Sequence, residues 1–222
     1  MIFFRAAMML FSLAQGWLQT FPVDLRSLKT EGEGTYFILK PGYQATFEGK
    51  EGAKSGKLVI TVLNETKAVG GVDTRIVEER EWNGAGELIE VSRNYFALHP
   101  ATGDVYYFGE DVDMYKKGKV VNHEGSWRHG SKGATFGLMM PGKPAVGMKF
   151  YQEQAKGVAM DRAEIVSLTD ELTTRAGAFD RCLKTKETTP LEPLAREYKI
   201  YAPGVGLVKD DDLSLVSHQF VR

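Results

Sequence analysis

The stretch YQATFEG (Tyr43–Gly49) alternates apolar and polar side chains residue by residue. Because successive side chains of a β-strand point to opposite faces, Tyr43, Ala45 and Phe47 are expected on one face and the polar residues between them on the other. One apolar and one polar face are typical of a strand in an antiparallel sheet that covers a hydrophobic interior. The stretch therefore predicts a β-strand with one buried side.

The same pattern returns along most of the chain of 222 residues. Period-two segments rich in Val, Ile, Tyr, Phe and Thr follow in the order KLVITVLNET, VDTRIVEEREW, LIEVSRNYFAL, VYYFGEDVDMY, VVNHEGSW, MKFYQEQA, RAEIVSLTDEL, AFDRCLKTKET, AREYKIYAPGVGLV and DLSLVSHQF. The short links between them carry Gly, Asn, Asp or Pro, and only residues 22–31 suggest a short helix. We expect an all-β fold: a long antiparallel meander that forms a curved half-barrel or an up-and-down barrel, with a β-sandwich as the alternative.

The N-terminus has the pattern of an export signal. Arg5 precedes an apolar run from Ala6 to Ala14, and Ser12 and Ala14 are small residues in the positions that precede a cleavage site. The run is too short to cross a bilayer as a helix. We predict a signal peptide over residues 1–14 and a single β domain over 15–222, without an integral membrane segment, in the periplasm or outside the cell. A buried N-terminal helix is the alternative.

Composition excludes some classes of function. The 28 basic and 29 acidic residues give a formal net charge of -1, without the basic stripe of a nucleic-acid-binding protein. Cys182 is the single cysteine, so no intramolecular disulfide can form. The sequence predicts neither a nucleic-acid partner nor a redox motif.

One segment differs from the alternating pattern. Residues 129–149 are rich in Gly and Met, and ATFGLMM is the part that could form a strand. Long loops inside compact domains are usually functional, and methionine side chains adapt easily to irregular apolar surfaces. The segment is expected to fold over the core or to act as a lid over an apolar cavity.

The stretch YFGEDVDMY brings several carboxylates together. In a regular strand Asp111 and Asp113 share one face, while Glu110 points to the other. The spacing does not fit a calcium-binding EF-hand loop. With loop carbonyl oxygens, Glu110, Asp111 and Asp113 could hold Ca²⁺; otherwise they form the solvated face of a hairpin.

Candidates for acid–base catalysis are few. Glu124, Glu153 and His123 are the side chains that a hydrolase or lyase acting on an extracellular polymer would use as acid and base. His123 and Glu124 are neighbours, and neighbouring strand residues face opposite ways. HGSKG and GAKSGKL match neither the GxSxG nucleophile motif nor a phosphate-binding loop. Catalysis is therefore an alternative to a binding function.

Several separated motifs resemble a family of bacterial secreted β-rich proteins. They are, in order, FILKPGYQATFEG, VYYFGEDV, GKVVNHEGSW, YQEQAKGVAMDRAEIVSL, TKETTPLEP and EYKIYAPGVGLV. The resemblance implies export and a β-rich domain, and it implies no particular activity. YAPGVGLV is also similar to the closing strands of half-barrel domains of the lipoprotein-carrier type, which implies an apolar concave face.

The chain departs from this family after the LIE motif. Glu90 is retained, but Asn94 and His99 stand where the family tends to have acids, which weakens any expectation that this segment binds a cation. The positions that match the family pattern are Glu110, Asp111, Glu124, Trp127, Gln152, Glu153 and Asp161.

The leading hypothesis is an exported binding protein for a hydrophobic or amphiphilic ligand, such as a lipid. Apolar concave pockets with few polar groups suit such molecules. We expect Tyr107, Trp127, Met139 and Tyr151 to line the pocket, and no cofactor to be needed. The first alternative is a Ca²⁺-stabilised extracellular structural or interaction domain, and the second is the hydrolase or lyase.

Overall fold

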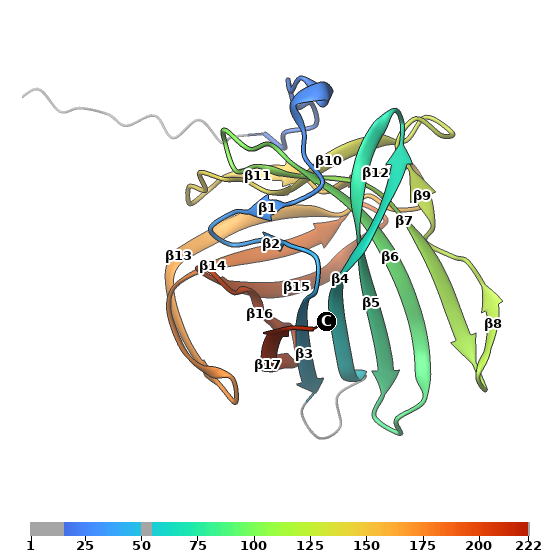
Figure 1. Cartoon of the computed structure of the whole chain (residues 1–222), viewed down its shortest axis with the longest axis vertical. Coiled ribbons are helices and arrows are strands. Elements are labelled where there is room, and N and C mark those ends of the chain that lie inside the picture. The colour runs from blue at the N-terminus through green and yellow to red at the C-terminus, as the bar shows by residue number, and fades with distance from the viewer. Residues whose placement is uncertain (1–15, 50–54, 222) are drawn as a thin grey trace, which may run out of the picture.

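The computed structural model describes residues 16–49 and 55–221, and in these ranges the chain is all-β (Figure 1). Seventeen strands and one 3-10 turn, η1 (Leu25–Ser27), make up the described secondary structure. The strands are β1 (Gly32–Glu33), β2 (Ile38–Leu39), β3 (Tyr43–Gly49), β4 (Ser55–Val69), β5 (Val72–Asn83), β6 (Leu88–Leu98), β7 (Val105–Lys116), β8 (Lys119–Asn122), β9 (Trp127–Arg128), β10 (Thr135–Met140), β11 (Lys149–Tyr151), β12 (Glu153–Gln154), β13 (Arg162–Thr174), β14 (Gly177–Thr189), β15 (Glu192–Ala202), β16 (Gly206–Asp210) and β17 (Leu213–Phe220).

Thirteen of the described strands form one continuous antiparallel path. Its order is β11-β13-β14-β15-β16-β17-β3-β4-β5-β6-β7-β10-β12, while β8 and β9 pair with β7, and β1 pairs with β2. Two meanders, β3 to β7 and β13 to β17, are joined where the last strand pairs with β3, with Phe220 opposite Tyr43 and Leu213 opposite Gly49. Figure 1 shows the two meanders curling around a common interior.

The path nearly closes on itself at Gln152. Its end strands, β11 and β12, are consecutive in the chain, and Gln152 is the one residue between them. Phe150 lies opposite Ala163 on one side of the crossing, and Glu153 lies opposite Phe136 on the other. The barrel prediction is therefore confirmed, and the β-sandwich alternative is not adopted.

A glycine allows this close crossing of chains. A Cβ atom added to Gly137 would lie 2.3 Å from the Gln152 carbonyl oxygen and 2.6 Å from that of Tyr151. Backbone atoms cannot move aside as a side chain can, so β10 passes the crossing only because residue 137 has no side chain. The glycines of the segment 129–149 thus serve packing as well as turns.

The alternation of YQATFEG produces the predicted burial. Tyr43, Ala45 and Phe47 are buried, and Phe47 is completely inaccessible. Burial of one such aromatic side chain stabilises the fold by about 2 kcal/mol. The largest fully buried side chains elsewhere include Tyr95, Phe108 and Phe150, which come from both halves of the barrel.

Two local predictions have a defined outcome. The helix expected in residues 22–31 is only the 3-10 turn η1, which the Asp24 side chain caps by accepting a hydrogen bond of 3.1 Å from the Arg26 amide. Residues 129–149 contain the strand β10, as ATFGLMM suggested, and its Leu138 and Met140 are buried. The predicted signal peptide lies outside the described residues. Within the described ranges, no helix has the length and hydropathy to cross a bilayer.

Candidate ligand-binding site

The barrel interior contains a cavity of about 520 Å³. Ligand pockets commonly have volumes of about 300–1,000 Å³, so the cavity has room for a small organic molecule. Its wall is built from inward-facing residues of β5, β6, β7, β10, β14 and β15 and from the crossing at Gln152. The charged and polar lining residues are Glu79, Glu90, Ser92, Asn94, Tyr107, Glu110, Gln152, Glu153, Asp161, Glu187, Thr189, Glu192, Glu197 and Lys199.

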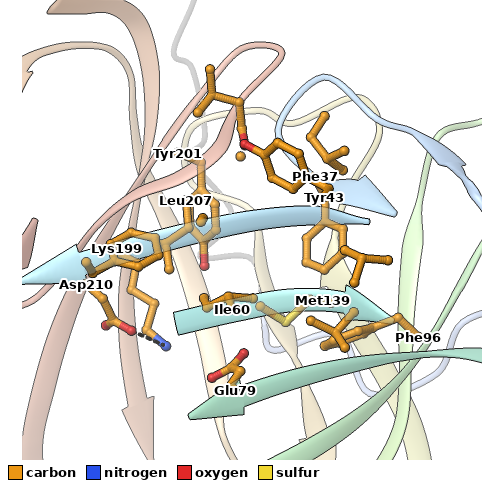
Figure 2. A pocket seen from close by; sticks show the side chains of 17 residues that line it. Phe37, Tyr43, Ile60, Glu79, Phe96, Met139, Lys199, Tyr201, Leu207 and Asp210 are labelled. Carbon is orange, nitrogen blue, oxygen red and sulfur yellow. Dashed lines mark hydrogen bonds and ion pairs between the residues drawn. The ribbon is translucent and has the colours of Figure 1, made fainter. Parts of the chain in front are cut away.

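A smaller apolar pocket of about 100 Å³ adjoins this cavity. Glu79, Phe96, Met139 and Lys199 line both, so the two spaces are parts of one interior. The apolar walls of the smaller pocket come from Phe37, Ile38, Tyr43, Ala45, Phe47, Ile60, Val62, Val77, Tyr201, Val205 and Leu207. Figure 2 shows these aromatic and aliphatic side chains around the pocket, with Glu79, Lys199 and Asp210 together at one side. The interior therefore has a polar section and an apolar section.

A β-bulge in β7 brings Tyr107 and Glu110 to the same wall. The register with β6 pairs Phe96 with Tyr107 and Asn94 with Glu110, so one extra residue of β7 is inserted between the two pairs. Gly109 occupies this bulge with φ 138°, and an added Cβ would lie 2.4 Å from the Trp127 carbonyl oxygen. The bulge thus depends on glycine, and it reverses the inward and outward alternation of the strand.

Hydrogen bonds fix the polar side chains at the base of this wall. The buried Tyr107 hydroxyl donates to Asn94 Oδ1. Asn94 Nδ2 donates to Ser92 Oγ at 3.2 Å and to the Val77 carbonyl at 3.4 Å. The network is internally satisfied, so it provides a rigid polar surface beneath the cavity.

Gln152 presents a free acceptor at the closing point of the barrel. The residue is only 4% exposed, and its Nε2 donates to Glu187 Oε1 at 3.2 Å and to the Met139 sulfur at 3.7 Å. This donation to a carboxylate fixes the orientation of the amide. Gln152 Oε1 is buried and has no hydrogen-bond partner. A buried acceptor without a partner costs about 1–3 kcal/mol, so this atom is available to a hydrogen-bond donor.

Lys199 supplies the positive charge of the lining. Its Nζ lies 3.3 Å from Glu187 Oε2 and 3.7 Å from Asp210 Oδ2. Burial lowers the pKa of Lys199, but the carboxylates of Asp210 and Glu187 outweigh that effect and hold the pKa well above its usual value. The lysine is therefore charged at neutral pH and already paired within the wall.

Several carboxyl groups of the cavity have raised pKa values. Burial raises the pKa of Glu79 to about 7 and that of Glu110 to about 8, and neighbouring carboxylates such as Glu90 add to both shifts. Burial likewise raises the pKa of Glu153 well above its usual value, with Glu110 adding to the effect. The cavity therefore holds protons near neutral pH that it can release when a positive charge arrives.

The structure separates the four residues expected to line a pocket. Tyr107 and Met139 line the cavity. Trp127 packs edge-on against Tyr107 at a centroid distance of 5.4 Å and lines a different pocket, of about 360 Å³. Tyr151 packs against the ring of Trp17 at 6.2 Å instead.

The three carboxylates considered for Ca²⁺ point to different surroundings. Glu110 lines the cavity, whereas Asp111 and Asp113 do not. Asp111 forms ion pairs with Arg128 at 2.6 Å and Lys67 at 3.1 Å, and it accepts a hydrogen bond of 2.6 Å from the Tyr95 hydroxyl. Asp113 pairs with Arg93 and His123, at 3.2 and 2.9 Å. Among residues 16–49 and 55–221, no group of three His, Cys, Asp or Glu side chains is arranged to hold a metal ion, and the Ca²⁺ site stays a prediction.

The catalytic candidates are likewise separated. Glu153 lines the cavity, whereas His123 and Glu124 lie in the exposed segment after β8. His123 Nδ1 lies 2.9 Å from the Val112 carbonyl oxygen. The hydrolase or lyase hypothesis stays a prediction, with Glu153 as its remaining candidate inside the cavity.

Four of the eight cavity acids, Glu79, Glu187, Glu192 and Glu197, were not among the candidates from the sequence. Glu79 follows Val77 on one face of β5, and Glu197, Lys199 and Tyr201 share one face of β15. Charged residues at every second position next to buried apolar ones are the signal that could have found them. In isolation that signal cannot be distinguished from a solvated strand face.

Comparisons with known proteins give one structural neighbour. A presumed exported protein with a YmcC-like fold from Bacteroides fragilis aligns over 84% of this chain and 99% of its own, with 18% sequence identity and a TM-score of 0.41. No family model matches the chain. No curated protein matches it either.

Proposed function

We propose that this chain is an exported binding protein for a small amphiphilic molecule. The observation that carries the proposal is the divided interior, in which a polar cavity of about 520 Å³ and an apolar pocket of about 100 Å³ share Phe96 and Met139. An amphiphile can place its apolar end among the aromatic side chains and its polar part against the hydrogen-bonding wall. The apolar run that follows Arg5 supports export.

The size of the apolar pocket restricts the ligand. A cavity of about 150 Å³ lined by apolar side chains holds one benzene molecule, so a pocket of about 100 Å³ admits only a short apolar group. The larger volume is polar. These dimensions favour a small amphiphile with a short alkyl or aromatic end over a lipid with long acyl chains.

Native mass spectrometry tests the proposal directly. The full chain is exported to the periplasm of a bacterial host, purified without detergent and sprayed from volatile buffer. We expect a second mass series, a few hundred daltons heavier at most, that collapses onto the bare protein mass on collisional activation. A protein that shows one bare mass, and that binds none of a panel of short amines, alcohols and acids, is not such a binding protein.

A matched pair of variants assigns the ligand to this interior. Ala45→Leu places a larger side chain in the apolar pocket, and we expect it to abolish the heavier mass series. Ala68→Leu adds the same atoms at an exposed position of β4, and we expect it to retain the series. Equal retention of the ligand by both variants would contradict the assignment.

A further inference from the structure

The wall of the polar cavity has a strong imbalance of charge. Among the described residues that line it, eight carry carboxyl groups and one, Lys199, carries a positive charge. The eight are Glu79, Glu90, Glu110, Glu153, Asp161, Glu187, Glu192 and Glu197. Lys199 is engaged by Glu187 and by Asp210 of the neighbouring pocket, so it does not balance the remaining acids.

Gln152 gives a second and independent indication of the ligand. Its Oε1 is a hydrogen-bond acceptor, is buried and lacks a partner in a wall that otherwise consists mainly of acceptors. Its orientation is held by the hydrogen bond that Nε2 donates to Glu187. A group that satisfies Gln152 Oε1 must donate a hydrogen, and a positively charged donor is the group that also neutralises the ionised form of the acids.

The arrangement of the acids distinguishes an organic cation from a metal ion. A metal ion needs several oxygen ligands at one point, about 2.0–2.6 Å from the ion. Within the described ranges, no three His, Cys, Asp or Glu side chains converge in that way. The acids are spread instead over β5, β6, β7, β12, β14, β15 and, with Asp161, the segment before β13, which suits N–H donors distributed over a molecule.

We propose that the polar part of the ligand is an organic ammonium group, whose N–H hydrogens are accepted by Gln152 Oε1 and by the cavity carboxylates around Glu110 and Glu153. This inference rests on the proposed function and names its chemical class: a small amine with a short apolar end. The apolar end occupies the pocket beside Phe96 and Met139, and the ammonium group lies in the larger cavity.

Proton release accompanies this binding. The titratable and charged groups that face Glu110 across the cavity are Glu79, Glu90, Tyr107, Glu153, Asp161, Glu187, Glu192, Glu197 and Lys199. The raised pKa values of about 7 for Glu79 and about 8 for Glu110 mean that both are largely protonated at slightly acidic pH. An incoming ammonium group favours the ionised form, so binding releases protons and becomes tighter as the pH rises toward 8.

A matched series of hexylamine, hexanol and hexanoate tests the inference by isothermal titration calorimetry on the full chain. The three probes share an alkyl chain and differ in charge. We expect hexylamine to bind about tenfold more tightly than hexanol, because hydrogen bonds to charged groups are the stronger ones, and hexanoate to bind most weakly. Titrations of hexylamine in buffers of different ionisation enthalpy are expected to show that protons are released on binding. Repeated at several pH values, they are expected to show an affinity that increases up to about pH 8.

Variants and the remaining outcomes decide the inference. Glu110→Gln is expected to lose the preference for hexylamine over hexanol, and Glu171→Gln, at an exposed position of β13, is expected to keep it. Equal affinity for all three probes would overturn the cation inference and leave the amphiphile proposal intact. If none of the three probes binds, the amphiphile proposal fails, and a titration with spermidine decides the cation inference. Spermidine binding with proton release would support the cation site. No binding of spermidine would overturn the cation inference.

Discussion

Tyr107 and Glu110 line the same cavity, although a separation of three residues would place them on opposite faces of a regular strand. The bulge at Gly109 is responsible, because it inserts one residue between the Phe96–Tyr107 and Asn94–Glu110 pairs. Tyr107 thereby anchors Asn94, while Glu110 faces the acids across the interior. The bulge at Gly109 thus determines which side chains of β7 face the cavity.

Substitution of that glycine is expected to destabilise the protein strongly. In Gly109→Ala the Cβ would lie 2.4 Å from the Trp127 carbonyl oxygen and 2.8 Å from the Arg128 Cα, in a conformation with φ 138°. We expect a loss of about 3 kcal/mol in the free energy of unfolding, measured by urea titration. Gly71→Ala is the control, because Gly71 also has a positive φ but no atom within 4 Å; we expect it to cost about 1 kcal/mol. Equal losses would show that the contact with β9 is unimportant.

Gly137→Ala is expected to loosen the closing point of the barrel. The new methyl group would overlap the backbone of Tyr151 and Gln152, so β10 and the crossing must separate. Hydrogen exchange measures the effect: amides of residues 149–154 should exchange faster than in the parent protein, while those of β4 and β5 keep their protection. Unchanged exchange at the crossing would contradict the role assigned to Gly137.

Stability is expected to fall as the pH rises from slightly acidic to slightly alkaline. Glu79 and Glu110 have folded-state pKa values of about 7 and about 8, above the value of 4.5 for an unperturbed glutamate. Between these limits the folded protein binds more protons than the unfolded chain, so the free energy of unfolding decreases with pH, by at most about 1.4 kcal/mol per pH unit for each group. Urea titrations between about pH 5 and about pH 8 measure the slope.

Glu110→Gln should flatten this slope, because a glutamine is neutral at every pH and nearly isosteric with the protonated acid. Glu171→Gln, at an exposed position, should leave the slope unchanged. A parent protein whose stability does not decrease over this range would show that the cavity acids ionise without cost.

Asp111 is expected to contribute to stability from the outer face of β7. Burial raises the pKa of Asp111, but hydrogen bonds from Arg128, Tyr95 and Lys67 outweigh that effect and lower it. Because the folded-state pKa is lowered, the stabilisation is present above the unfolded-state pKa and is lost as the pH falls below it. Asp111→Asn should cost about 1–3 kcal/mol at neutral pH by urea titration.

The control for Asp111 is an ion pair in a solvated position. Asp180 and Arg181 pair at 3.2 Å with side chains that are 71% and 78% exposed. Asp180→Asn is expected to change the free energy of unfolding by less than about 0.5 kcal/mol, as exposed pairs generally do. If Asp111→Asn lowers the free energy of unfolding no more than Asp180→Asn does, the hydrogen bonds and ion pairs of Asp111 do not stabilise the fold.

The sequence predicts the strands and the barrel but not which strand face lines the interior. Alternation identifies Tyr43, Ala45 and Phe47 correctly because β3 has one apolar face. In β6 the opposite faces are both shielded: Tyr95 is 1% exposed on one, and Asn94 is 5% exposed on the other. The alternation of side chains then does not indicate which face of β6 points into the barrel. Apolar residues are wrongly expected to be the ones that point inward.

The cavity itself depends on features that leave little trace in the sequence. The closing strands β11 and β12 have three and two residues, too few for a periodic pattern. The bulge at Gly109 is marked only by a glycine within a strand-like run, which is also compatible with a simple turn. Glu79 and Lys199 line the same cavity as Tyr107 and Met139 only because long-range strand pairing brings β5 and β15 to its wall.

Substitution of Lys199 is expected to destabilise the fold, because it leaves neighbouring buried carboxylates without a positive partner. In Lys199→Met the carboxylates of Glu187 and Asp210 lose their ammonium partner while they remain largely buried. Breaking a buried pair costs about 3–5 kcal/mol, and because the side chains of this group are 10–22% exposed we expect a loss nearer about 2 kcal/mol at neutral pH. Protonation removes an unpaired negative charge from the wall, so the deficit should shrink as the pH is lowered toward about 5. Lys209→Met, on the neighbouring strand β16, is the control and should lack this pH dependence. A deficit in Lys199→Met that is constant with pH would show that the lysine acts through packing of its alkyl chain and not through its charge.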